Sequence, residues 1–198
     1  MIELIKNDAV IQVYFSEIFV KFIHEDIFGK DLTWRNSTFT VDGFKEFLMS
    51  KEKDGSKRFL LKTLSRKPLF TVDAHNLLVR RFIDESIVAE TLTSLEHYFD
   101  DAFLMEAKIR SKLRKKFGKD RIRRELHISE QAFDEIYDKI QKQENLDPIT
   151  QILKLIKNPE DLTDRRIRKR WIGKLHQRGF ELDDIYQSLT IANKNPYY

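Results

Sequence analysis

The apolar and polar positions of residues 1–55 predict a small unit of strands followed by a helix. Residues 10–23 are rich in β-branched and aromatic side chains, which suit two antiparallel strands joined at the polar pair Ser16-Glu17. Ser-Glu is a poor pair for a tight turn, so a longer connection stays open. Thr40 precedes apolar residues at helical spacing, and we place the end of this unit in the polar stretch 51–55.

From residue 56 onward every segment has helical periodicity, and the scarcity of Gly (six) and Pro (four) favours uninterrupted helices. Asp147-Pro148 is typical of an N-cap followed by proline in the first turn, and Asn158-Pro159 predicts the end of a helix. Gly118 and Gly179 stand where a left-handed C-terminal residue is favoured. The pattern predicts nine helices, at 56–65, 71–82, 86–98, 100–116, 119–126, 129–144, 148–157, 163–178 and 181–191.

These nine helices are compatible with a threefold repeat. Ile83, Ile128 and Phe180 serve as anchors, and each is followed by acidic or capping residues and then by apolar residues five and nine positions on. The predicted fold is mainly α. It has a strand-containing N-terminal unit (1–55) and three tandem three-helix repeats over 56–198, at about 56–98, 99–144 and 147–191, in an elongated, curved array.

Composition narrows the class of protein. The absence of Cys removes disulfides and thiolate metal sites and fits a reducing compartment. No signal-like N-terminus occurs, and no apolar run approaches the roughly 20 residues that a membrane span needs. We therefore expect a cytoplasmic monomer that does not contact a membrane.

Charge is distributed unevenly along the chain. Residues 1–55 carry seven Lys and Arg against ten Asp and Glu, whereas residues 56–198 carry 29 against 22. Residues 108–124 hold ten basic residues and one acid, and residues 165–178 hold seven basic residues and no acid. Such runs are either solvated helix faces or surfaces for an anionic partner.

A helical projection of residues 163–178 places Ile167, Trp171 and Leu175 on one apolar stripe. The cations on the opposite face repel one another in an isolated helix, which favours an anionic partner. The candidate basic face comprises Lys108, Lys112, Lys115, Lys116, Lys119, Arg121, Arg123, Arg124, Arg165, Arg166, Lys169 and Arg170. Arg110 and Arg114 fall nearer the apolar side, where we expect stems over the core or structural ion pairs.

The anion could be phosphate or an acidic protein surface, because long-range electrostatics serves both. Exposed aromatic residues are not interleaved with the basic ones, which disfavours binding of single strands as the main role.

Enzymatic chemistry has little support in the sequence. The five His residues are isolated and lack metal-ligand spacing, and no Gly-rich phosphate loop occurs. Asp100-Asp101 and Asp183-Asp184 stand at predicted helix starts, where capping is the simpler role. We expect no catalytic residue, no metal and no cofactor.

Several motifs resemble the RecX family of recombinase regulators. Leu175–Phe180 is similar to that family's Leu-x-x-(Lys/Arg)-Gly-Phe turn, and Tyr98–Phe103 resembles its joint between the first and second repeats, in which an aromatic residue or Leu precedes Asp-Asp and a Phe follows. Residues 116–126 resemble its Arg-rich middle helix, and 57–67 its opening helix. The resemblance covers about 56–191, and 10–55 more weakly.

Two positions depart from the family pattern. Phe82 stands where the family has Gly, and after Leu126 the chain lacks about three residues of a Lys-Gly turn.

The resemblance implies a regulator, active in recombination, DNA repair and the SOS response, that lies in the groove of the RecA–DNA filament. It also implies inhibition or modulation of recombinase and ATPase activities, with weak, non-specific binding of DNA. Two alternatives from other classes are a helix-turn-helix array acting on duplex DNA without RecA and a scaffold that joins helical partners.

Overall fold

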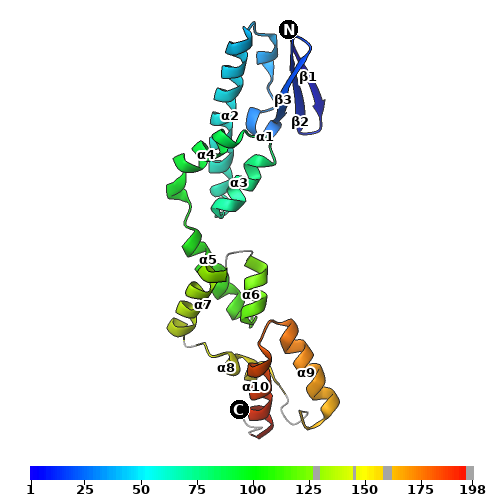
Figure 1. The fold of residues 1–198 in the computed structure, drawn as a ribbon, viewed down its shortest axis with the longest axis vertical. Helices are drawn as coiled ribbons and strands as arrows, with labels where there is room; N and C mark the ends of the chain where they lie inside the picture. Colours follow the sequence, from blue (N-terminus) through cyan, green and yellow to red (C-terminus); the bar gives the residue numbers. More distant parts are fainter. Residues whose placement is uncertain (127–129, 145, 158–161, 195–198) are drawn as a thin grey trace. The chain divides into compact units, whose positions relative to one another are not determined.

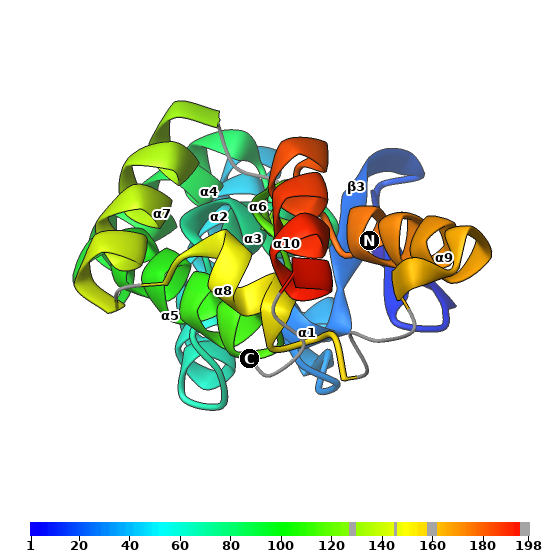
Figure 2. The same cartoon turned by 90° about the horizontal axis from the view of Figure 1, so that it is seen from below.

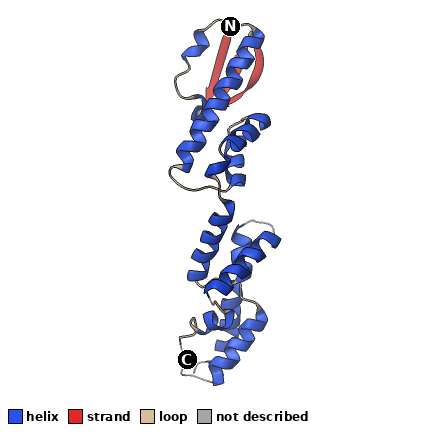
Figure 3. Cartoon of the chain, turned by 90° about the vertical axis from the view of Figure 1, so that its left-hand side faces the viewer, coloured by secondary structure: helices blue, strands red, loops and turns tan. Residues whose placement is uncertain are grey.

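The computed structural model describes residues 1–126, 130–144, 146–157 and 162–194 (Figure 1). The chain is mainly helical and has one small antiparallel sheet, as predicted. It divides into two compact units, Met1–Asp101 (unit 1) and Ala102–Tyr198 (unit 2), so this division does not coincide with the boundary that we placed at residue 55. Among the described residues, strands occur in unit 1 alone (Figure 3).

Unit 1 opens with a three-stranded sheet of β1 (Ile2–Asn7), β2 (Val10–Phe15) and β3 (Ile18–His24), in that order. The predicted strands are β2 and β3, whereas β1 was missed. Phe15 pairs with Ile18, so the connection is only Ser16-Glu17. Both residues have positive φ (50° and 68°), the backbone that a two-residue hairpin turn requires, and the longer alternative is therefore wrong.

The helix predicted after Thr40 is α2 (Val41–Leu64), and Thr40 caps it by accepting a hydrogen bond from the Gly43 N–H (3.1 Å). The predicted break at 51–55 is wrong, because α2 runs through it without interruption. Glu52 within that stretch is buried, where it accepts from Lys21 Nζ (2.6 Å) and from the Asp84 N–H (2.8 Å). The stretch is therefore a continuous part of α2 and not a linker, with Glu52 buried and Lys51, Lys53 and Asp54 exposed.

Gly55 explains how closely the short helix α1 (Glu25–Phe28) approaches α2. A Cβ at this position would lie 2.2 Å from the Ile27 carbonyl oxygen, so only glycine allows the contact.

The rest of unit 1 consists of α3 (Thr71–Val79), α4 (Glu85–Ser94) and the 3-10 turns η1 (Thr33–Asn36) and η2 (Glu96–Tyr98). These elements and the sheet enclose one core, whose buried members include Ile11, Val13, Phe44, Leu60, Leu78 and Val88.

Helix α5 (Asp101–Arg114) begins at the last residue of unit 1 and continues into unit 2. The other helices of unit 2 are α6 (Lys119–Leu126), α7 (Glu130–Glu144), α8 (Pro148–Leu153), α9 (Arg165–Gln177) and α10 (Leu182–Lys194). Helix α10 lies beside α8 and α9 (Figure 2). Asp147 caps α8 as predicted, accepting from the Thr150 N–H (2.8 Å). The predicted stop at Asn158-Pro159 lies outside the described residues.

The predicted inward edge of each repeat is largely confirmed. Five and nine positions after the anchors, Phe133, Tyr137, Ile185 and Leu189 are buried, as is Val88, while Leu92 is half-buried. Anchors Ile83 and Phe180 are buried, and Ile128 lies outside the described residues.

Helices α3 and α9 end in the same turn. Gly179 has the predicted left-handed φ (86°), and the Phe180 N–H donates to the Leu175 carbonyl (3.3 Å). Phe82, at the matching position of the first repeat, also has positive φ (62°), and the Ile83 N–H donates to the Leu78 carbonyl (3.4 Å). The departure from glycine therefore leaves the turn unchanged.

The prediction for Gly118 is wrong, because Lys116 holds the left-handed position after α5 (φ 57°). Gly118 instead packs against Gly179 and donates its N–H to the Arg178 carbonyl (2.8 Å). A Cβ on Gly118 would lie 2.2 Å from the Gly179 oxygen. This backbone contact holds the α5–α6 turn against the α9–α10 turn.

Candidate basic interface

Helix α9 presents four exposed cations, Arg165, Arg166, Lys169 and Arg170, here called the α9 surface. The opposite side of the helix is apolar: Leu175 is buried, and Trp171 and Ile172 pack against the core shared with α8 and α10. Asp164 begins the helix and accepts a hydrogen bond from the Arg166 N–H (2.6 Å). The apolar stripe thus directs the four cations outward, as the helical projection predicted.

No acidic side chain among the described residues forms an ion pair with any of the four cations. Two of them lie in the first turn of α9, which contains no acidic residue. The N-terminal end of a helix carries partial positive charge, so cations there are unfavourable by a few tenths of a kcal/mol each. A bound anion would supply the missing counter-charge and would offset the unfavourable position of the two cations at the N-terminal end of the helix.

Gly173 lies on the exposed part of α9, and nothing stands within 4 Å of the position that its Cβ would occupy. The fold therefore gives no packing reason for glycine at this position, where it costs roughly 1 kcal/mol relative to alanine.

Several basic residues of α5 and α6 have a different environment, because they pair with acidic side chains. Glu125 pairs with both Lys112 and Arg121, the latter at 2.9 Å. These two partners lower the pKa of Glu125 to about 2. Lys119 pairs with Asp134 (2.9 Å) and lies over the Tyr137 ring (5.4 Å).

Three more cations between residues 108 and 124 contact neighbouring protein groups. Asp120 lies 3.6 Å from the Arg123 guanidinium, and its carbonyl accepts from Arg124 (3.2 Å). Lys116 donates to the Lys154 carbonyl (3.3 Å). Lys108 and Lys115 are exposed.

Arg110 forms the predicted structural pairs, with Glu144 and with Glu106 (3.6 Å). Arg114 is exposed and has no acidic partner within the described ranges, so the ion pair considered for it does not form.

The twelve predicted site residues do not form one compact patch. Arg178, just after the C-terminal end of α9, donates to the carbonyls of Lys115 (3.4 Å) and Lys116 (3.3 Å). Arg165 begins the other end of this 13-residue helix, roughly 20 Å away at 1.5 Å per residue. The structure therefore separates Lys112, Lys119, Arg121 and Arg123, which pair with acidic side chains, from the four unpaired cations on α9.

The acidic pairs considered as carboxylate candidates lie at helix starts. Asp101 accepts a hydrogen bond from the Thr71 N–H (2.9 Å) and so caps α3, whose own N-cap residue, Phe70, cannot accept one through its side chain. Asp183 and Asp184 lie in the first turn of α10. Burial raises the pKa of Asp184, and the nearby acids Glu181, Asp147 and Asp183 raise it further.

Within the described ranges, no three His, Asp or Glu residues gather in a way that could hold a metal ion. None of the described helices combines the length and the apolar character needed to cross a bilayer.

Comparison with known proteins supports one fold. No protein-family model matches the sequence, and no curated protein matches it. The structure is similar to a crystal structure of the regulatory protein RecX, with a TM-score of 0.62 and 17% identity over 96% of this chain and 97% of that chain. This chain therefore has a RecX-like fold, in agreement with the resemblance of its sequence motifs.

Proposed function

We propose that this protein binds the RecA–DNA filament and inhibits or modulates its recombinase and ATPase activities. Support comes from the RecX-like fold together with the sequence motifs between residues 57 and 180. The observation that carries the proposal is the α9 surface, four exposed cations without an acidic partner in the described parts of the chain. We propose a cytoplasmic, non-enzymatic monomer that needs no cofactor.

The α9 surface also accounts for the proposed weak binding of DNA. Its four cations can neutralise about four phosphates, and each phosphate contributes about −0.9 to the slope of log K against log salt on duplex DNA, so a slope of roughly −3 to −4 is expected. Contacts to phosphates fix position and carry no sequence information, so defined and scrambled duplexes should bind equally.

The direct test measures RecA ATP hydrolysis and strand exchange on preformed filaments as the protein is added. We expect both activities to fall as the protein approaches saturation of the filament. Unchanged activity at an excess of protein over filament would refute the proposal.

A second measurement separates the filament from naked DNA. Binding to each is followed as salt rises, and the filament complex should survive salt that dissociates the DNA complex. Tight binding of one duplex sequence at high salt, without RecA, would instead support a helix-turn-helix protein.

A further inference from the structure

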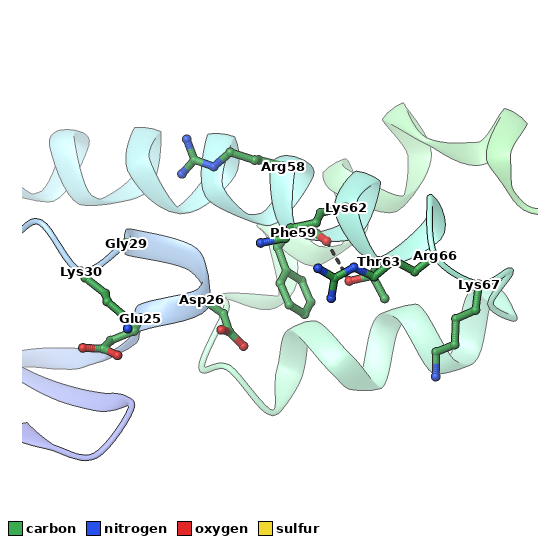
Figure 4. A pocket seen from close by; sticks show the side chains of 10 residues that line it. All are labelled: Glu25, Asp26, Gly29, Lys30, Arg58, Phe59, Lys62, Thr63, Arg66 and Lys67. Carbon is green, nitrogen blue, oxygen red and sulfur yellow. Dashed lines mark hydrogen bonds between the residues drawn. The ribbon is translucent and has the colours of Figure 1, made fainter.

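A second group of unpaired cations lies in unit 1, around a cavity of about 610 Å³ beside the C-terminal half of α2 (Figure 4). Lys62, Arg66 and Lys67 approach it from α2 and the residues just after it, and Lys30 from the loop after α1. None of these four was among the candidates chosen from the sequence. The full lining is Glu25, Asp26, Gly29, Lys30, Arg58, Phe59, Lys62, Thr63, Arg66 and Lys67.

The two acids of the cavity already have partners outside it. Glu25 pairs with Lys6, and Asp26 pairs with Arg81 (2.7 Å). The lining cations Lys30, Lys62, Arg66 and Lys67 form no ion pair with a described residue. Lys30 interacts electrostatically with Glu25, while Lys62, Arg66 and Lys67 leave positive charge in the cavity that no described acid pairs with.

This concentration of charge is unexpected in unit 1, which has 14 Lys and Arg against 17 Asp and Glu. The C-terminal end of α2 explains how the cations gather at little expense, because its carbonyl groups carry partial negative charge. Helix polarity does not explain Lys30, which belongs to another segment and lines the same cavity. A concave site lined by one sign of charge focuses the electrostatic potential on a ligand of opposite sign.

We propose that this cavity binds a phosphate-bearing anion through Lys62, Arg66, Lys67 and Lys30. A guanidinium beside ammonium groups suits phosphate, because Arg donates two parallel hydrogen bonds and Lys adds compact positive charge. The phosphate can belong to a nucleic-acid backbone or to a free polyphosphate anion. This site is distinct from the α9 surface, and it does not require RecA.

The test compares two double variants, in α2 and the residues just after it, that change the net charge equally. Lys62→Glu/Arg66→Glu alters the cavity, and Lys45→Glu/Lys57→Glu alters two exposed lysines of the same helix outside it. Both are made in a full-length chain that also carries Arg165→Glu/Arg166→Glu, so that the α9 surface is weakened. The probes are inorganic pyrophosphate, by calorimetry, and a fluorescent 20-nucleotide duplex, by anisotropy at low salt.

We expect the cavity variant to lose at least about tenfold in affinity, since two charge-assisted contacts are removed. The lysine control should change less than about twofold, because screened charges outside the site contribute little. Loss for both probes identifies a general phosphate site, and loss for the duplex alone identifies the nucleic-acid backbone as the source.

Equal effects of the two double variants, an unaffected cavity variant, or no binding of either probe to the parent chain would each overturn the proposal. Thermal melts check that the variants fold, and Lys62→Gln/Arg66→Gln replaces the charge reversal if it unfolds the protein. Because RecA is absent from the assay, the result is independent of the proposed filament function.

Discussion

Helices α6 and α9 are similarly basic in sequence but differ in whether their cations form ion pairs with acidic side chains. Arg121 on α6 and Lys112 on α5 share Glu125, and Lys119 pairs with Asp134 of α7. On α9, Arg165, Arg166, Lys169 and Arg170 have no acidic partner in the part of the chain that the structure describes. Charge density along a sequence therefore does not identify a binding surface, because the neutralising acids come from other helices.

The largest effect should come from reversing charge on α9. Arg165→Glu/Lys169→Glu should weaken duplex binding by about 100-fold at 50 mM salt, because losing two phosphate contacts removes about 1.8 from the salt slope. Filament binding should weaken in the same direction. Anisotropy with labelled duplex and with RecA filament measures both.

The thermal stability of this variant should stay within about 0.5 kcal/mol of the parent, since the substituted side chains are exposed. A collapse in stability would show that these cations support the fold. Unchanged binding would show that the cations of the α9 surface are only solvated and contact neither DNA nor the filament.

For the paired cations of α5 and α6 we expect the reverse, a larger effect on stability and a smaller effect on duplex binding. Lys112→Glu/Arg121→Glu would place two new carboxylates beside Glu125 and replace attraction by repulsion. The melting temperature should fall further than in the α9 variant, while duplex affinity should fall less than tenfold, the size of about one lost contact. A loss of affinity equal to that of the α9 variant would erase the distinction between the two helices.

Low pH should also distinguish the two groups of cations, because the pairing of Lys112 and Arg121 depends on the charge of Glu125. The pKa of Glu125 is lowered from 4.5 to about 2 by Lys112 and Arg121, so its stabilising contribution is complete above pH 4.5 and is lost as the pH falls through about 2. Glu125→Gln should remove that part of the acid dependence and lower stability at neutral pH. The carboxyl carbon of Glu125, followed by NMR from pH 6 to pH 1.5, reports the pKa directly; a midpoint near 4.5 would contradict the pairing.

The smallest effect should come from Gly173→Ala on α9. The added methyl group meets nothing within 4 Å, so the substitution should stabilise the protein by up to about 1 kcal/mol through helix propensity. Duplex affinity should change less than about twofold, because the phosphates contact the charged ends of the Arg and Lys side chains and not the helix backbone at residue 173. A large loss of filament affinity alone would indicate that RecA approaches the helix closely at this glycine.

Several features of this protein follow from the sequence alone. Enrichment in β-branched and aromatic residues predicted strands β2 and β3 in residues 10–23. Helical periodicity predicted α6 at its observed limits and the outward face of α9. Asp147 and Thr40 predicted the starts of α8 and α2. All these features depend on local spacing and capping, which a segment of ten to twenty residues contains within itself.

The tertiary structure decided those features that depend on contacts between residues distant in sequence. The polar stretch 51–55 reads as a break, yet Glu52 is buried between Lys21 and the Asp84 N–H, 31 and 32 residues away. Gly118 serves an inter-turn contact with Gly179 in place of a left-handed turn. The pairing of the α5 and α6 cations, the freedom of those on α9 and the cavity of unit 1 likewise depend on which helices meet. Periodicity places a side chain on one face of its helix, but the charge that faces it across the gap is supplied by another part of the chain.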